Sequence, residues 1–245
     1  MNRICQPADL WTDETTMNTD IALQLGDLIT SLGGDLCGVA DLTDVAPLPG
    51  DGDRVDLTPY PRAVSIAVIF PRAIVQELLR GPSHTYLYEY NILNTRLDDV
   101  ALRVSSFLQV AGYASYPVPA SQRNGSDRFQ SIFSHRLAAR LAGLGWIGKN
   151  CCLVTPQYGP RVRLVTVLTG APLAAGSPIT RDCGDCTECV DACPPGAIKG
   201  LHFRADQPLR DRFDAAACTT YKDKVRDRWG KRCCGLCLAS CPVGQ

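Results

Sequence analysis

The sequence has no apolar run long enough to cross a membrane, no net charge, and neither a tandem repeat nor a low-complexity tract. Its longest apolar stretch, Ala63–Phe70, is about as long as one strand, which excludes a transmembrane helix. The balance of 25 Lys and Arg against 25 Asp and Glu gives no whole-molecule attraction to nucleic acid or anionic lipid. The polar N-terminus, MNRICQPADLWTDETT, shows neither a signal peptide nor a twin-arginine pair. We therefore expect a cytoplasmic protein without a membrane partner.

The composition is that of an ordinary globular protein, with 45% hydrophobic and 20% charged residues in a chain of 245. This length suits one large domain, or a medium domain with a small appendage. The unusual feature is 13 cysteines, which need an explanation other than disulfides in a reducing compartment. Nine of them fall between Cys183 and Cys241.

Hydrophobic spacing predicts alternating strands and helices up to about residue 170. This alternation indicates an α/β or α+β sandwich in which helices cover a sheet. The stretch 171–180 is rich in Pro, Ala and Gly and is expected to be a linker between an α/β domain at 1–172 and a small domain at 173–245. The predicted helices are 20–32, a short one after Pro71, 86–110 and 129–142, and the predicted strands are 36–40, 63–70, 114–118, 152–155 and 162–169.

The cysteines from Cys183 to Cys193 have the ferredoxin spacing for cubane iron–sulfur clusters, C-x2-C-x2-C-x3-C-P. In that motif the fourth Cys, followed by Pro, ligates a second cluster, so a second set of ligands is required. Cys234-x2-Cys237-x3-Cys241-Pro242 repeats the end of the motif. Pairing by this crossover predicts set A, which is Cys183, Cys186, Cys189 and Cys241, and set B, which is Cys193, Cys218, Cys234 and Cys237.

Zinc is the alternative occupant, because Cys-x2-Cys pairs also suit a structural zinc ion. Zinc motifs rarely place three cysteines at successive x2 spacing before an x3-Cys-Pro, so the pattern favours two [4Fe-4S] clusters. Cys233 is the expected spare thiol beside Cys234, although the two neighbours could exchange roles. The remaining cysteines, Cys5, Cys37, Cys151 and Cys152, are expected to pack as small core thiols.

The segment GLGWIGKN at 143–150 nearly matches a nucleotide-binding P-loop. It fails where Asn150 replaces the Ser or Thr that holds Mg²⁺, and it follows a helix instead of a strand. Its three glycines are expected to allow a tight turn and a close approach of the backbone, either to the sheet or to a cofactor.

Candidate proton donors precede this loop. His135 is either a partly exposed polar residue or a proton donor or cofactor contact. Tyr86, Tyr88 and Tyr90 cluster at a predicted helix start, and one of them could donate a proton, although Tyr90 lies on the apolar face. Residues 222–232 carry six basic and two acidic side chains, which either offset the negative clusters or dock an acidic electron donor.

Three segments together resemble one family. ARLAGLGWIGKN at 139–150, the cysteine framework with CTTY at 218–221, and CGLCLASCP at 234–242 are similar to epoxyqueuosine reductase and to the core that it shares with reductive dehalogenases. The segment SLGGDLCGVAD at 31–41 resembles the helix-to-strand step of that family. The resemblance implies a nitroreductase-like α/β domain that carries cobalamin and a two-cubane ferredoxin-like domain that supplies electrons. It also implies cofactor contacts from Gly143, Gly145, Trp146, Gly148 and Lys149.

The chain departs from the family in three ways. It stops at Gln245 without the family's helical-repeat segment, it has no export signal, and the family's Asp-containing stretch before the loop is replaced by Asp127–His135. Asp127 is the expected substitute for that Asp. The sequence therefore predicts an oxidoreductase, a small corrinoid-dependent reductase with Asp127, His135 or Tyr90 as proton donor. The alternative is a non-enzymatic electron-transfer or corrinoid-protein reactivating module. Reduced ferredoxin or flavodoxin is the expected donor, a small molecule or corrinoid protein the expected acceptor, and tRNA is not expected.

Overall fold

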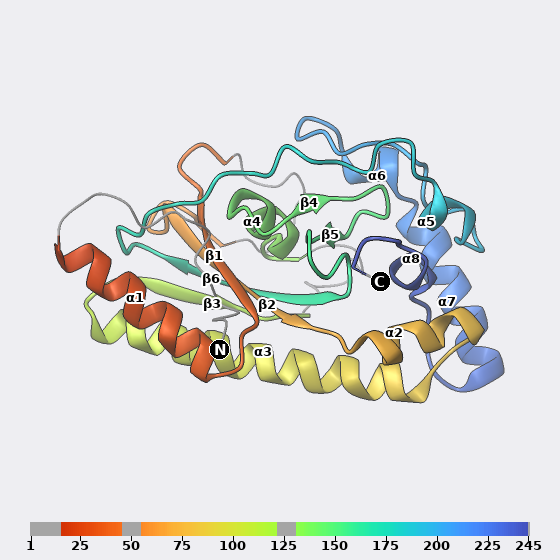
Figure 1. Ribbon diagram of the computed structural model, residues 1–245, viewed down its shortest axis with the longest axis horizontal. Coiled ribbons are helices and arrows are strands. Elements are labelled where there is room, and N and C mark those ends of the chain that lie inside the picture. The colour runs from red at the N-terminus through yellow and green to blue at the C-terminus, as the bar shows by residue number, and fades with distance from the viewer. Residues whose placement is uncertain (1–15, 46–54, 122–130, 245) are drawn as a thin grey trace. The chain divides into compact units, whose positions relative to one another are not determined.

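Four strands form the main sheet of the computed structural model, which describes residues 16–45, 55–121 and 131–244 (Figure 1). The strand order is β1-β2-β6-β3, with β1 antiparallel to β2 and β3 antiparallel to β6. The two central strands are buried almost throughout, as expected for a sheet covered on both faces. The predicted strands 36–40, 63–70, 114–118 and 162–169 are thus confirmed as β1 Leu36–Asp41, β2 Arg62–Ile69, β3 Ser115–Val118 and β6 Val162–Thr169.

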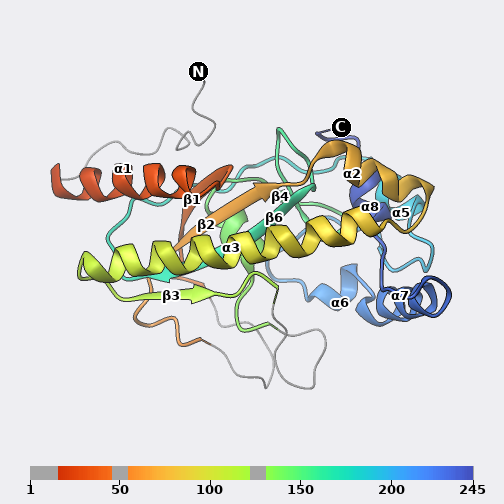
Figure 2. The same cartoon turned by 90° about the horizontal axis from the view of Figure 1, so that it is seen from below.

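Helices cover the sheet. The helix α1, Thr16–Ser31, and the long helix α3, His84–Val110, lie along one face in Figure 2. Both were predicted, because apolar residues recur along one side of each and Gly33 or Gly112 follows with a positive φ. The helix α4, His135–Leu141, contacts β1. Together these elements give a mixed α/β fold with an antiparallel arrangement at both sheet edges.

The helix α4 is shorter than the predicted 129–142. It begins at His135 because the Ser134 hydroxyl caps it, accepting a hydrogen bond from the Leu137 amide at 3.3 Å. Residues 129 and 130 lie outside the described residues. The side chains of Ile132 and Phe133 still pack inward, into an apolar cluster formed by Ala40, Leu42, Ala63, Val118, Ala138, Ala142 and Leu168.

The described residues divide into two compact units. Unit 1 holds residues up to 68 together with 93–144 and 163–179, and therefore most of the sheet. Unit 2 combines three segments far apart in sequence, 69–92, 145–162 and 180 onward. The domain boundary predicted after residue 172 stays a prediction. What the structure adds is that the cysteine-rich segment packs with two earlier segments of the chain.

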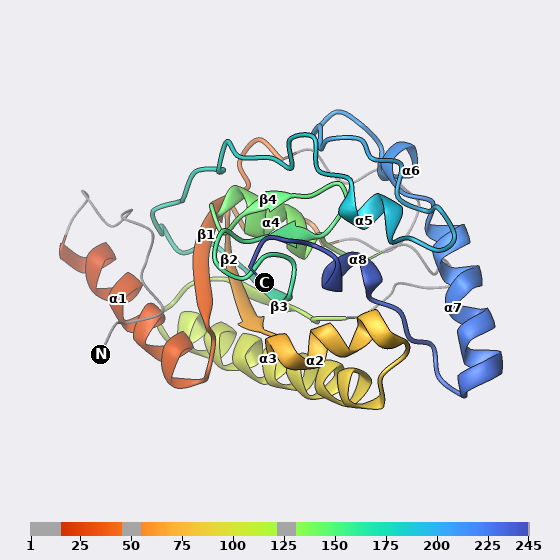
Figure 3. The same cartoon turned by 45° about the vertical axis from the view of Figure 1, so that its right-hand side comes forward.

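Unit 2 contains a two-stranded hairpin, several helices and the first part of α3, up to residue 92. In Figure 3, the helix α8 lies beside α5 and close to α2, and these contacts bring 72–80 and 188–239 together. None of the helices in the described part of the chain is long and apolar enough to span a membrane. The elements of unit 2 are α2 Arg72–Glu77, η1 Leu78–Arg80, β4 Trp146–Ile147, β5 Leu153–Val154, α5 Glu188–Asp191, α6 Leu209–Arg212, α7 Ala215–Trp229 and α8 Leu236–Ala239.

Candidate functional site

The turn between β4 and β5, residues 148–152, is the structural centre of unit 2. We call it the central turn. The Gly148 amide donates to the Cys152 carbonyl at 2.9 Å, and the Cys151 amide donates to the Gly148 carbonyl at 2.9 Å. Cys151 has φ 59°, a left-handed conformation that is costly for a residue with a side chain. The chain is thus held in a tight reversal that points successive side chains in different directions.

One side of the central turn meets set A. The Lys149 ammonium donates to the carbonyls of Gly184 and Cys186 at 2.8 and 3.0 Å, inside the loop that carries the first cysteines. A Cβ added at Gly148 would lie 3.5 Å from the Cys183 sulfur and closer still to Asn150 and Val154. Gly148 is therefore required by the close packing of Asn150 and Val154, and the Cys183 sulfur lies at ordinary contact distance beyond them.

The other side of the central turn meets set B. The Asn150 amide group donates to the Cys237 carbonyl at 3.1 Å, and its oxygen accepts from the Cys152 amide at 3.0 Å. The Cys152 thiol hydrogen-bonds the Cys237 thiol. The sequence predicted only a small core thiol at Cys152, whereas the structure places it next to the predicted ligand Cys237.

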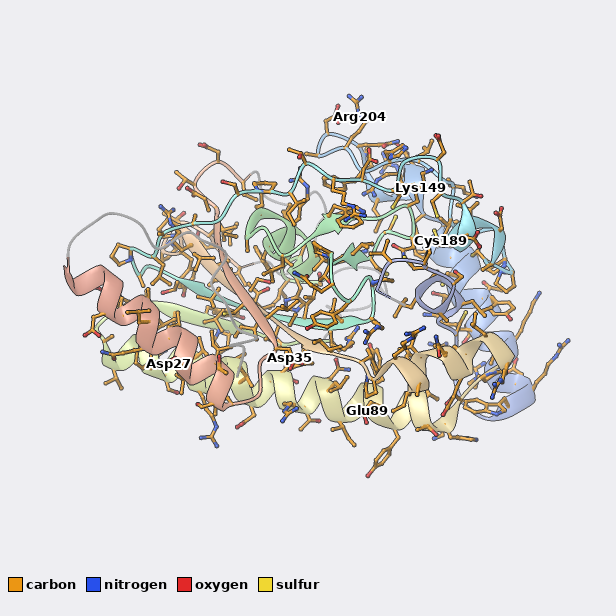
Figure 4. The ribbon with its side chains drawn as sticks, viewed as in Figure 1. Asp27, Asp35, Glu89, Lys149, Cys189 and Arg204 are labelled. Carbon is orange, nitrogen blue, oxygen red and sulfur yellow. The ribbon has the colours of Figure 1, made fainter. Side chains whose placement is uncertain are left out.

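The four cysteines of set A are electrostatic neighbours. Burial raises the pKa of Cys189 to about 12, and the nearby Cys183, Cys241 and Cys186 thiols add to this effect. Burial likewise raises the pKa of Cys241, with Cys183 and Cys186 again contributing. The fold thus brings Cys241 back to the first three cysteines, as the crossover requires. In Figure 4, Cys189 and Lys149 are both labelled in this part of unit 2.

The four cysteines of set B are also electrostatic neighbours, because their thiols affect one another's pKa. The pKa of Cys237 is raised by its hydrogen bond with Cys152, by burial, and by the nearby Cys234 and Cys218 thiols. Burial raises the pKa of Cys218, and Cys234 and Cys193 raise it further, whereas Lys222 lowers it. Residues from α7, from the segment before α8 and from the end of the first motif therefore converge on one place.

Cys233 and Cys234 face different surroundings. Cys233 is buried, and its thiol lies 3.9 Å from the Ser83 carbonyl at the start of α3. Cys234, by contrast, influences the pKa of Cys218 and Cys237 within set B. This geometry favours Cys234 as the ligand and Cys233 as the spare thiol. Cys37 is half-buried in β1, and Cys5 lies outside the described residues.

The spacing between the thiols bears on the zinc alternative. Within the described ranges, no three His, Cys, Asp or Glu side chains lie close enough together to hold one metal ion. A tetrahedral zinc site needs its ligands gathered around a single ion. A cubane holds its four thiolates farther apart, because four irons and four sulfides lie between them. The choice of two cubanes over zinc stays a prediction.

Unit 2 also buries two cations. Lys149 is 7% exposed and Arg212 is 4% exposed, while no Asp or Glu is buried among the described residues. The Arg212 guanidinium lies 3.6 Å from the Cys151 sulfur and over the Phe203 ring, and its Nε has no hydrogen-bond partner among the described residues. Buried charge is costly unless an anion balances it. A cubane with four thiolates is such an anion, so the residues present fit two clusters.

The glycines of the loop have structural reasons of their own. A Cβ at Gly143 would lie 2.7 Å from the Ser177 carbonyl oxygen, and one at Gly145 would clash with the Val154 carbonyl oxygen. Glycine density alone therefore does not indicate a bulky ligand. Trp146, however, has one feature that would suit a bulky ligand. Its ring is 3% exposed, and its indole N–H has no acceptor among the described residues.

His135 has a structural role within unit 1. Its Nδ1 lies 2.8 Å from the Thr166 hydroxyl, and its Nε2 lies 3.0 Å from the Pro119 carbonyl. Since a carbonyl only accepts, Nε2 carries the proton and Nδ1 accepts from Thr166. Burial lowers the pKa of His135 to about 4. The side chain is thus a neutral link between α4, β6 and the segment after β3.

The other predicted proton donors differ in how far the structure describes them. Tyr90 is half-buried on α3, with its ring centroid 6.4 Å from that of Tyr86, which in turn stacks on Phe70. Tyr88 is exposed. Asp127 lies outside the described residues. The roles of Tyr90 and Asp127 as proton donors stay predictions.

No protein-family model matches the chain. The epoxyqueuosine reductase of Bacillus anthracis is 34% identical over 123 residues, which is 46% of this chain and 30% of that protein. The epoxyqueuosine reductase of Gloeobacter violaceus is 52% identical over 60 residues, which is 24% of this chain and 19% of that protein. The matched segments thus cover about a third or less of these curated relatives.

Solved structures match nearly the whole chain. A reductive dehalogenase structure, described with a mechanism for B12-dependent dehalogenation, has a TM-score of 0.74 and 19% identity over 95% of this chain and 33% of that chain. An epoxyqueuosine reductase crystal structure has a TM-score of 0.58 and 24% identity over 92% of this chain and 66% of that chain. The chain shares the fold of both structures and is a distant sequence relative of the epoxyqueuosine reductases.

Proposed function

We propose that this chain is an iron–sulfur oxidoreductase with two [4Fe-4S] clusters, a cobalamin-dependent reductase similar to epoxyqueuosine reductase. In this proposal unit 2 contains a double-cubane, ferredoxin-like domain, and the sheet belongs to a nitroreductase-like sandwich. When bound, the clusters supply single electrons and the corrinoid supplies the metal at which the substrate is reduced. The observation that carries the proposal is the convergence of eight cysteines on the two sides of the central turn.

The residues have separable tasks. The eight cysteines would bind the clusters, and the central turn would hold the two sets at a fixed separation. Trp146 would donate from its buried indole N–H to an amide or phosphate oxygen on the corrinoid, because a buried donor without an acceptor costs about 1–3 kcal/mol. Tyr90 or Asp127 would supply a proton to the substrate. His135, held neutral between Thr166 and Pro119, is the weakest of the three proton donors considered.

The test is anaerobic reconstitution of the full chain with iron and sulfide, followed by addition of cobalamin. Two sets of four thiolates predict about eight irons and eight acid-labile sulfides for each chain. Four irons, or one equivalent of zinc, would contradict the cluster assignment. Binding of added cobalamin, followed by its visible spectrum, is expected for the wild type and should weaken in Trp146→Phe without loss of iron.

One observation favours a second candidate function. The contacts made at Gly143, Gly145 and Gly148 are all with the protein itself, so the loop does not need a corrinoid to explain it. The chain would then be an electron-transfer or corrinoid-protein reactivating module. Cluster-loaded protein that ignores cobalamin, yet reduces a separate corrinoid protein, would support this function over the first.

We further propose that reduced ferredoxin or flavodoxin docks on α7. Lys224 and Arg228 are exposed on this helix and Lys231 is exposed just after it, and Asp223 and Asp227 are already paired with Arg226 or Arg232. Cys218 of set B lies on the same helix, which gives a short route for the electron. Reduction of the clusters by either donor should slow with rising salt and in Lys224→Glu, but not in Arg204→Glu, where an exposed Arg pairs with Asp206.

A further inference from the structure

Lys149 is a buried cation held against the loop of set A. The residue, labelled in Figure 4, is 7% exposed. Its ammonium donates to the Gly184 and Cys186 carbonyls at 2.8 and 3.0 Å. In the part of the chain that the structure describes, Lys149 makes no ion pair with a carboxylate. Two carbonyl dipoles solvate the ammonium, but they do not neutralise its charge.

A side chain that only held this loop in place by hydrogen bonds would not need a charge. A neutral amide or hydroxyl could donate to the same carbonyls without the cost of removing an ammonium from water. The opposite side of the central turn shows this alternative, because there the neutral amide of Asn150 donates to the Cys237 carbonyl. The turn thus presents a cation to set A and a neutral group to set B.

We propose, on the basis of the cluster-binding function proposed above, that Lys149 sets the reduction potential of the cluster held by set A. In the reaction concerned, the reduced donor protein loses one electron and the cluster gains it, so the cluster becomes more negative by one unit without a bond being formed. A fixed cation in a water-poor site stabilises the more negative state more strongly. Lys149 therefore raises the potential of set A relative to set B.

This asymmetry gives the electron a direction. Set B receives the electron near α7, where Lys222 is half-buried near Cys218 and Lys224, Arg226 and Arg228 are exposed, so solvent and salt screen these charges more than that of Lys149. The cluster of set A, next to a buried cation, has the higher reduction potential and therefore holds the electron more stably. Electrons entering at set B would move through the central turn region to set A, and the loop that contains Trp146 would stand next to the cluster from which they leave.

The experiment is a redox titration of the reconstituted full chain, followed by EPR, in the wild type and three variants. Lys149→Met removes the charge and the donor, Lys149→Gln removes the charge but keeps a donor, and Lys149→Arg keeps both. One of the two midpoint potentials should fall in the Met and Gln variants by at least a tenfold change in the reduction equilibrium, about 59 mV for one electron, and return in the Arg variant.

Lys199→Met is the matched control. Lys199 lies in the same unit and also donates to a backbone carbonyl, that of Gly196 at 3.3 Å, but it is exposed. Both midpoint potentials of the Lys199→Met variant should match those of the wild type. Unchanged potentials in Lys149→Gln, or loss of four irons in all three Lys149 variants, would overturn the proposal and leave the two-cluster assignment intact. A wild-type chain that binds no cluster would overturn both.

Discussion

The Asn150 amide group bonds the Cys237 backbone carbonyl at 3.1 Å, and this contact fixes the central turn to set B. The same side chain accepts from the Cys152 amide at 3.0 Å, so one buried residue closes the turn and attaches it to α8. Asn150 is the position at which the loop departs from a P-loop. An amide suits this double role because it donates from its nitrogen and accepts at its oxygen, whereas a hydroxyl has a single oxygen for both.

Asn150→Ala should destabilise the chain by about 1–3 kcal/mol, because it leaves the Cys237 carbonyl and the Cys152 amide without their partner. The measurement is the denaturant midpoint of the anaerobic, cluster-loaded protein. Asn150→Asp is the informative companion, since it keeps the acceptor and loses the donor. A midpoint unchanged in both variants would show that the turn is held by other contacts.

Separate alanine substitutions at Cys233 and Cys234 test which of the two thiols binds the cluster of set B. Cys233→Ala should retain about eight irons, because its thiol faces the Ser83 carbonyl, whereas Cys234→Ala should lose the cluster of set B and keep about four. The two variants differ only in which of two adjacent thiols is removed, so each controls for the other. The reverse result, with iron lost from Cys233→Ala alone, would reassign the ligand.

The crossover has its own test in Cys241→Ala. This change should damage the cluster of Cys183, Cys186 and Cys189, although Cys241 belongs to the second motif, because these thiols are its neighbours in the fold. EPR of the reduced variant should show the signal of set B alone. Retention of the set A signal together with loss of the set B signal would mean that each motif binds its own cluster.

Sequence periodicity was sufficient to predict a helix or strand where that element buries a continuous apolar face. This is why α3 and the two central strands were predicted, whereas β4 was missed, because Trp146 and Ile147 form only two paired residues between glycines. The helix α7 was missed for another reason. It buries no residue, so it has no apolar stripe from which a helix could be read.

The grouping of the cysteines into two sets of neighbours could be predicted from spacing, since the ferredoxin motif encodes its own crossover, and their role as cluster ligands stays a prediction. The place of the central turn could not. Nothing local in Lys149, Asn150 or Cys152 indicates that they meet residues 184–237, because the contact depends on how three distant segments fold into one unit. Sequence reasoning therefore assigned Lys149 to a cofactor and Cys152 to the core, whereas the structure shows both beside predicted cluster ligands.

The stability of the chain should depend on pH through His135. Its pKa is about 4 in the folded state and near 6.5 when unfolded, so the folded state favours the neutral ring. The stabilisation is complete above pH 6.5 and is lost as the pH falls from 6.5 toward 4, because only the unfolded chain then binds the proton. Between pH 7 and pH 5 the loss from this residue is about 2 kcal/mol.

The measurement compares the denaturant midpoint of wild type and His135→Gln at both pH values under anaerobic conditions. The Gln variant cannot titrate, so its stability should fall less on acidification, although it starts lower because the contacts with Thr166 and Pro119 are disturbed. His202→Gln is the control, since His202 is exposed and lies 3.4 Å from Asp182. Equal losses in wild type and His135→Gln would show that His135 is protonated without cost, and that the ring is not held neutral by its surroundings.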